Sequence, residues 1–196
     1  MAKSSTSIYG FAFARSLTGV DLPVSLDFII DDSVTVAIGD PVRVDAAGYI
    51  KRSTAGVAIL GICIGLVDQN GVNVFSPRAS GTTGATLTPD DTVATSSTNT
   101  SDATRKLKAQ VVVSPGGEIL WKNTASAALA QTNLCQFFDV GSTVGQIDVS
   151  TASDTSGQFQ LLALDPDTTT IGLFRVAEGE LAWNVNSYNS SAIIAS

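Results

Sequence analysis

The stretch that decides the fold is residues 34–52, VTVAIGDPVRVDAAGYIKR. Runs rich in Val and Ile, at residues 34–38, 41–44 and 49–52, are separated by Gly39-Asp40 and by Asp45-Ala46-Ala47-Gly48. β-Branched residues favour strands, whereas Gly, Asp and Pro interrupt strands and favour turns. The pattern therefore predicts a series of short, consecutive β-strands.

The same pattern continues along the rest of the chain. Further strands are predicted at residues 59–67, 107–113, 118–122, 135–140, 147–149, 158–164 and 170–176, with Asp165-Pro166-Asp167 as the turn between the last two. Residues 124–131 are the one helix candidate, because Thr124 can cap an Ala-rich run. We predict a mainly β fold, a small β-barrel or sandwich with an extended N-terminal arm and at most one short helix.

Residues 1–33 differ from the rest of the chain. Gly10, Gly19 and Pro23 interrupt any helical period there, and apolar residues are sparse. Residues 24–28 alternate with period two, which predicts one short strand or an arm laid along a neighbour. We therefore divide the chain into an extended N-terminal arm, residues 1–33, and a β-rich domain, residues 34–196, with a long loop or seam at the Ser/Thr-rich residues 76–104.

Charge and hydropathy exclude two classes of partner. The chain has a net charge of −7 and only 11 Lys and Arg residues, which are scattered, whereas a nucleic-acid partner requires clustered cations. The longest apolar run, residues 57–67, is about half the length of a membrane span. We predict neither nucleic acid nor membrane as a partner. Cys63 and Cys135 lie in apolar, strand-like runs, so we predict that both are buried and reduced.

The residue types also limit the chemistry. The chain has no histidine, which excludes Ser-His-Asp and Cys-His catalysis and removes the usual zinc ligand. The adjacent pairs Asp31-Asp32 and Asp90-Asp91 would point to opposite faces of a strand. Asp165-Pro166-Asp167 lacks the spaced ligands of a calcium loop. We predict no catalytic residues, no metal site, no cofactor and no enzymatic activity.

A series of motifs runs through the N-terminal part of the chain. The motifs are, in order, Gly10-Phe11-Ala12-Phe13-Ala14-Arg15-Ser16-Leu17-Thr18-Gly19, Gly39-Asp40-Pro41-Val42, Gly48-Tyr49-Ile50, Ala55-Gly56 and Ile59-Leu60-Gly61-Ile62-Cys63-Ile64-Gly65. Over residues 8–75 the series resembles the capsid decoration (head-cement) proteins of tailed bacteriophages and cyanophages. The resemblance implies a virion protein that binds the major capsid protein on the outer surface of the expanded icosahedral head. It would bridge capsomers and stabilise the shell, after assembly in the bacterial host cytoplasm.

The arm supplies the candidate capsid-binding residues. Phe11, Phe13, Arg15 and Leu17 have no periodic apolar partner face, which predicts that they are mobile in the free protein and become ordered against capsid subunits. The glycine-bearing strand at residues 59–67 predicts self-association, with a homotrimer favoured over a dimer. Two other functions stay open: a phage tail or receptor-binding structural module, and a carboxylate-dependent hydrolase.

Overall fold

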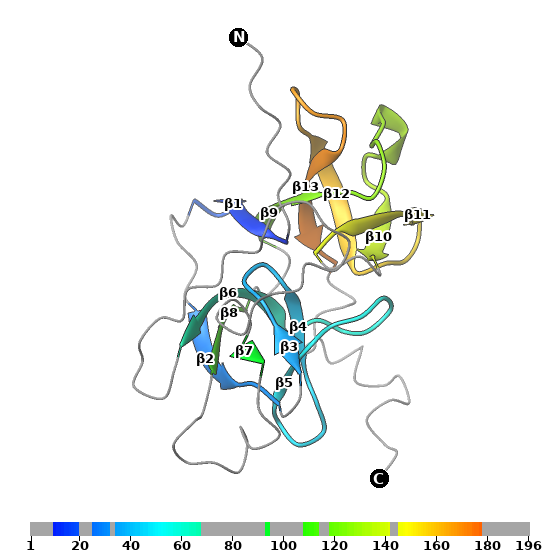
Figure 1. The fold of residues 1–196 in the computed structure, drawn as a ribbon. Coiled ribbons are helices and arrows are strands. Elements are labelled where there is room, and N and C mark those ends of the chain that lie inside the picture. The colour runs from blue at the N-terminus through cyan, green and yellow to red at the C-terminus, as the bar shows by residue number, and fades with distance from the viewer. Residues whose placement is uncertain are drawn as a thin grey trace.

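The computed structural model describes residues 10–19, 25–31, 34–67, 93–94, 108–113, 118–141 and 145–177 (Figure 1). Most regular structure in these residues is antiparallel β-strand, so the predicted mainly β class is confirmed. The described strands form two sheets consistent with a β-sandwich, and they form no closed barrel.

Six strands form the larger sheet. In spatial order they are β1 (Ala12–Ser16), β9 (Ile119–Thr124), β13 (Ile171–Val176), β12 (Phe159–Leu164), β10 (Phe137–Val140) and β11 (Ile147–Ser153), and each pairs with its neighbour in antiparallel orientation. Leu164 pairs with Gly172, so the turn at Asp165-Pro166-Asp167 closes the predicted hairpin between β12 and β13. β1 and β11 are the two edges of this sheet.

Five strands form the second sheet. In spatial order they are β2 (Ser25–Ile29), β8 (Lys108–Val112), β6 (Gly61–Val67), β4 (Pro41–Val44) and β5 (Ile50–Arg52). A separate pair, β3 (Thr35–Val36) with β7 (Val93–Ala94), contacts this sheet through β5. The sheet is curled, which brings its two edge strands together at one end: Ile30, directly after β2, forms a parallel bridge with Ile50 in β5.

Two apolar clusters stabilise this arrangement. The larger cluster combines side chains from both sheets and from the loop before β6; it includes Trp121, Phe138, Phe159, Phe174, Ile59, Ile62 and Val112. The smaller cluster lies within the curl of the five-stranded sheet and includes Ile30, Val42, Ile50, Cys63, Leu66, Ala109 and Val111. Full burial of one large apolar side chain stabilises a fold by about 1.5–3 kcal/mol. Because the larger cluster contains side chains from both sheets, the two sheets share a core.

A backbone junction also links the two sheets. A Cβ atom at Gly10 would lie 3.0 Å from the Gly39 Cα atom. The N–H of Phe11 donates to the Gly39 carbonyl at 2.8 Å, and the N–H of Gly39 donates to the Cys63 carbonyl at 2.7 Å. Both glycines have positive φ, 91° and 88°, which residues with a Cβ atom rarely adopt. Three motifs that are distant in sequence thus meet at one point.

The predicted helix at residues 124–131 is wrong. Thr124 is the last residue of β9, and the only helical turn in the described residues is a 3-10 turn, η2 (Gln131–Asn133). The N–H of Ala125 donates to the Thr170 carbonyl at 2.8 Å, so this backbone pairs with a distant segment and not with itself. Tertiary pairing here outweighs the helix propensity of alanine.

The structure also places part of the predicted arm inside the sheets. β1 pairs with β9, and β2 pairs with β8. The partner strands of both lie far along the chain, so a local pattern could not reveal them. Residues 1–9, 20–24 and 32–33 lie outside the described residues, as does the predicted seam at residues 76–104 apart from β7.

The two cysteines differ in environment. Cys63 is buried in β6, as predicted. Cys135 is exposed just before β10, where its φ is 67°, so its predicted burial is wrong. No disulfide links the two residues.

Candidate functional site

The predicted capsid-binding residues do not form one surface. Phe11 is 4% exposed, and its ring stacks on Phe159 with ring centroids 4.3 Å apart. Phe13 is half-buried and meets the ring of Trp121 edge to face at 6.3 Å. Both aromatic side chains belong to or pack against the larger apolar cluster. Phe11 is therefore a core residue in the structure, and it can reach a partner only if the core opens.

Arg15 and Leu17 lie on the surface. Arg15 is exposed on β1, and Leu17, which follows the strand, is 56% exposed. A β-bulge between Phe13 and Arg15 breaks the register of β1 with β9. Bulges twist an edge strand away from further pairing. Two of the four predicted residues are thus available to a partner, but on an irregular edge.

The strand β2 offers a second, more regular edge. Its five residues pair with β8 without a register shift, from Ser25 with Val112 to Ile29 with Lys108. Leu26 is 52% exposed, and its neighbour in the strand is also exposed. Among the described residues no strand pairs with the outer side of β2. Such an edge presents backbone N–H and C=O groups to an incoming strand.

The edge strand β11 is closed by nearby side chains. Ser126 Oγ accepts a hydrogen bond from the N–H of Val149 at 3.0 Å. Asp148 Oδ1 accepts one from the N–H of Ser150 at 2.9 Å. The N–H of Ser126 also donates to the Ile147 carbonyl at 2.8 Å, so the segment at Ala125 and Ser126 already occupies part of the outer edge of β11.

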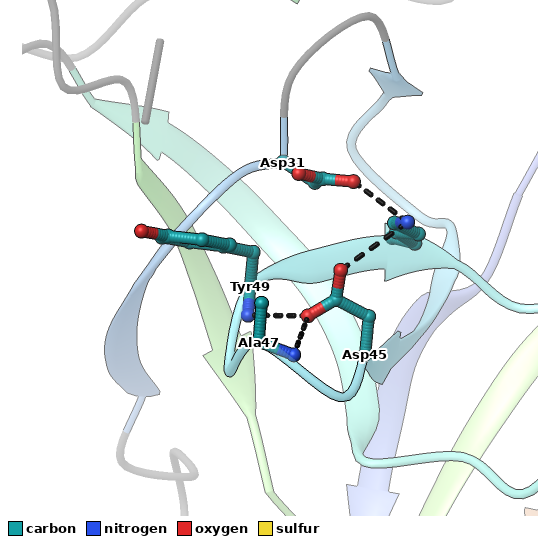
Figure 2. Close-up of polar contacts among 5 residues, drawn as sticks. Asp31, Asp45, Ala47 and Tyr49 are labelled. Atoms are coloured by element: carbon teal, nitrogen blue, oxygen red, sulfur yellow. Dashed lines mark hydrogen bonds and ion pairs between the residues drawn. The ribbon is translucent and has the colours of Figure 1, made fainter. Parts of the chain in front are cut away.

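The edge strand β5 is closed by Asp31 and by an ion-pair cluster. The N–H of Asp31 donates to the Ile50 carbonyl at 2.9 Å. Lys51 Nζ lies 2.7 Å from Asp31 Oδ2 and 3.2 Å from Asp45 Oδ2. Figure 2 shows the carboxylates of Asp31 and Asp45 approaching the same cation from two segments. These three charged residues, the Lys51 cluster, join the segment after β2 to β5 and to the β4–β5 turn.

The protonation equilibria of the Lys51 cluster follow from its hydrogen bonds. Burial alone would raise the pKa of Asp45, but hydrogen bonds from the N–H of Tyr49, the Lys51 ammonium and the N–H of Ala47 hold that pKa below its ordinary value of 3.8. Hydrogen bonds to Asp31 and Asp45 hold the pKa of Lys51 above its ordinary value of 10.5. Asp45 and Lys51 are therefore ionised at neutral pH, which suits a structural ion pair.

A buried amide links the two halves of the fold. Gln158 is fully buried, and its Nε2 donates to the carbonyls of Thr54 at 2.8 Å and Val57 at 2.6 Å, in the loop before β6. Its Oε1 accepts a hydrogen bond from the N–H of Val140 in β10 at 3.0 Å. Leaving such buried groups unpaired costs about 1–3 kcal/mol each.

Three further carboxylates, those of Asp139, Asp148 and Asp165, take part in similar local contacts. Asp139 in β10 lies directly opposite Asp148 in β11. Asp139 Oδ1 accepts a hydrogen bond from the N–H of Gln158 at 3.1 Å, and Asp148 Oδ1 accepts one from Ser150 Oγ at 2.7 Å. The Lys122 ammonium, 2.8 Å from Asp165, lowers the pKa of that carboxyl. The described residues contain no group of three side chains that could bind a metal ion.

No known protein family, curated protein or solved structure matches this chain. In the part of the chain that the structure describes, no helix has the length and apolar character needed to cross a membrane. The residues and their geometry therefore carry the functional argument.

Sequence reasoning missed β2 as a candidate binding surface. The alternation at residues 24–28 was the available signal, and it correctly indicated a short strand. It did not indicate that Leu26 and Asp27 would be exposed on a sheet edge, because that depends on which strand occupies the next position in the sheet.

Proposed function

We propose that this chain is a structural protein without catalytic activity that decorates the outer surface of a tailed-phage head. In this proposal it binds the major capsid protein, bridges neighbouring capsomers and stabilises the expanded shell. It resides on the virion surface after assembly in the host cytoplasm.

The observation that carries the proposal is the motif series from Gly10 to Gly65 together with its use in the fold. Members of three motifs meet at the junction between the sheets. The N–H of Phe11 bonds to Gly39, and the N–H of Cys63 donates to the Asp40 carbonyl at 2.9 Å. Asp40 Oδ2 in turn accepts the N–H of Ala37 at 2.8 Å. Because residues of three motifs contact each other at one junction, the motif series is better explained by a similar fold than by a chance similarity of turn sequences.

The charge distribution is compatible with this role. The net charge of −7 favours a position outside the shell, away from packaged DNA. Asp31, Asp45 and Asp165 each form an ion pair with a lysine of the same chain. These three carboxylates thus have a structural role, because their ion pairs stabilise the fold.

We propose further that the protein acts as a homotrimer, with a dimer as the second choice. Strand β6, whose glycines suggested self-association, lies inside the five-stranded sheet, and Ile64 is its one exposed large apolar residue, at 38%. Self-association would therefore use other surfaces. Sedimentation of the purified chain at micromolar concentration tests this, and a stable monomer would contradict it.

The decisive experiment is binding to expanded shells that lack the protein, assembled from a tailed-phage major capsid protein. We expect saturable co-sedimentation with expanded shells, a regular lattice of added density in images of the particles, and greater resistance of the shells to heat. Unexpanded shells are the matched control. An absence of binding to expanded shells, with correctly folded protein, would refute the proposed function.

A further inference from the structure

The outer edge of β2 has the properties of a docking site for an extended segment. The strand is regular along Ser25–Ile29 and lies at the end of the five-stranded sheet, and no described strand pairs with the outer side of these five residues. The open edge ends at Ile29, because Ile30 bridges Ile50 of β5. In the two larger sheets, each other edge carries a feature that opposes pairing: the bulge in β1, the Ser126 side chain beside β11 and the Lys51 cluster at β5. Proteins commonly protect exposed strand edges in these ways. Among the described residues β2 has no such protection, so its edge is the one suited to binding a strand.

The side chains of β2 define what an added strand must contain. Leu26 pairs with Val111, and Phe28 pairs with Ala109, so both lie on the face that carries the smaller apolar cluster. Asp27 points to the opposite face, since side chains alternate along a strand. Asp27 forms no ion pair with any residue in the described part of the chain. A complementary strand would place apolar residues opposite Leu26 and Phe28 and a cation opposite Asp27.

A second copy of this chain does not meet these requirements. If two copies paired antiparallel about a twofold axis at the centre of the strand, Leu26 would face Phe28 but Asp27 would face Asp27. Like charges directly opposite each other destabilise a strand pair. Asp27 thus acts against pairing between copies and favours a partner that carries a basic residue at that position.

We propose that the β2 edge accepts an extended segment of the capsid subunit in which one Lys or Arg stands between two apolar residues. Main-chain hydrogen bonds supply affinity in such strand addition, and the alternate side chains supply specificity. This inference rests on the proposed decoration function for the identity of the partner. It assigns the attachment to the edge of β2, and no longer to aromatic side chains of a free arm.

Hydrogen exchange on the shell-bound protein tests the position of the contact. Full-length protein is bound to expanded shells, and exchange of the amides in residues 25–29 is compared with that of the free protein. We expect slower exchange of these amides only in the bound state. Binding to shells with unchanged exchange in β2 would overturn the edge assignment while leaving the decoration function intact. In the free protein only the amides that bond to β8 should be protected; protection of the other β2 amides would show that the outer edge is already paired and would also overturn the assignment.

A charge exchange tests the chemistry of the partner independently of the shells. The probes are two blocked synthetic peptides, one with Lys between two Val residues and one with Glu in place of that Lys. Wild-type protein should prefer the Lys peptide by about tenfold, and the D27K variant should reverse the preference. D167K changes the same charge at an exposed turn and should leave the preference of the wild type unchanged.

The two experiments separate the two proposals. Reversal of peptide preference by D27K, without binding to shells, would support the edge and refute the decoration function. Binding to shells without any reversal of the peptide preference would support the decoration function and refute the edge assignment. Because Asp27 is exposed, D27K should fold, and its circular dichroism spectrum checks this.

Discussion

Replacing Phe11 with Ala tests whether the N-terminal segment belongs to the core or to an arm. Phe11 is 4% exposed, and its ring stacks on Phe159 at 4.3 Å. Truncation of a buried Phe to Ala lowers the free energy of unfolding by about 3–5 kcal/mol. In a chain of this size, each kcal/mol lowers Tm by about 2–4 °C. We therefore expect F11A to lower Tm by roughly 6–20 °C.

The assay is thermal and urea unfolding followed by near-ultraviolet circular dichroism, which reports the packing of aromatic rings. Two variants of the same segment serve as graded controls. F13A should cost less than F11A, because Phe13 is half-buried against Trp121. R15A should change the free energy of unfolding by no more than about 0.5 kcal/mol, because Arg15 is exposed.

An arm predicts the opposite order. If F11A melted at the wild-type temperature but lost its affinity for expanded shells, Phe11 would be a binding residue of a separate arm. The burial argument, and with it the place of β1 in the sheet, would then be refuted. Equal losses of stability in all three variants would contradict the gradient of burial on which the argument depends.

Three further outcomes follow from the polar contacts. Because the pKa of Asp45 is held below 3.8, its ionised form stabilises the fold above that pH, and this contribution is lost as pH falls through the folded-state value. The difference in urea midpoint between wild type and D45N should therefore shrink on acidification. D148N removes a like charge opposite Asp139 and should raise stability by about 0.2–1 kcal/mol at low salt, measured by urea unfolding; a hydrolase acting through this pair would instead lose activity. Q158L leaves several buried groups unpaired and should lower the free energy of unfolding by about 2–4 kcal/mol, whereas a neutral result would refute the buried amide as a link between the sheets.

The β4–β5 hairpin of the second sheet was predictable from local pattern. The predicted runs at residues 41–44 and 49–52 correspond to β4 (Pro41–Val44) and β5 (Ile50–Arg52). Both runs are bounded by turn residues, and the hairpin between them needs no distant partner. Local period and turn chemistry are sufficient where consecutive strands pair with each other.

The rest of the fold depends on pairing over long distances. β1 (Ala12–Ser16) contains one large apolar residue, Phe13, so its sequence gives only a weak strand signal. Its partner β9 begins at Ile119, more than 100 residues later. The predicted helix failed for the same reason, since its first residues extend β9 and bond to the segment before β13. The burial of Phe11 was not predictable for the same reason, because this side chain has a partner face only after the sheets pack together.

The motif series and the binding surface are therefore carried by different residues. Gly10 packs against Gly39 at the junction, Gly39 and Asp40 form backbone hydrogen bonds with Cys63 in β6, and Phe11 fills the core beside them. A residue used in this way is constrained by packing and has no freedom to match a particular partner. Exposed positions have that freedom, and they include Arg15 and Leu17 within the series and Leu26 and Asp27 in β2. The motif series thus accounts for the junction and part of the core, whereas the proposed choice of partner depends on exposed positions that take no part in the junction.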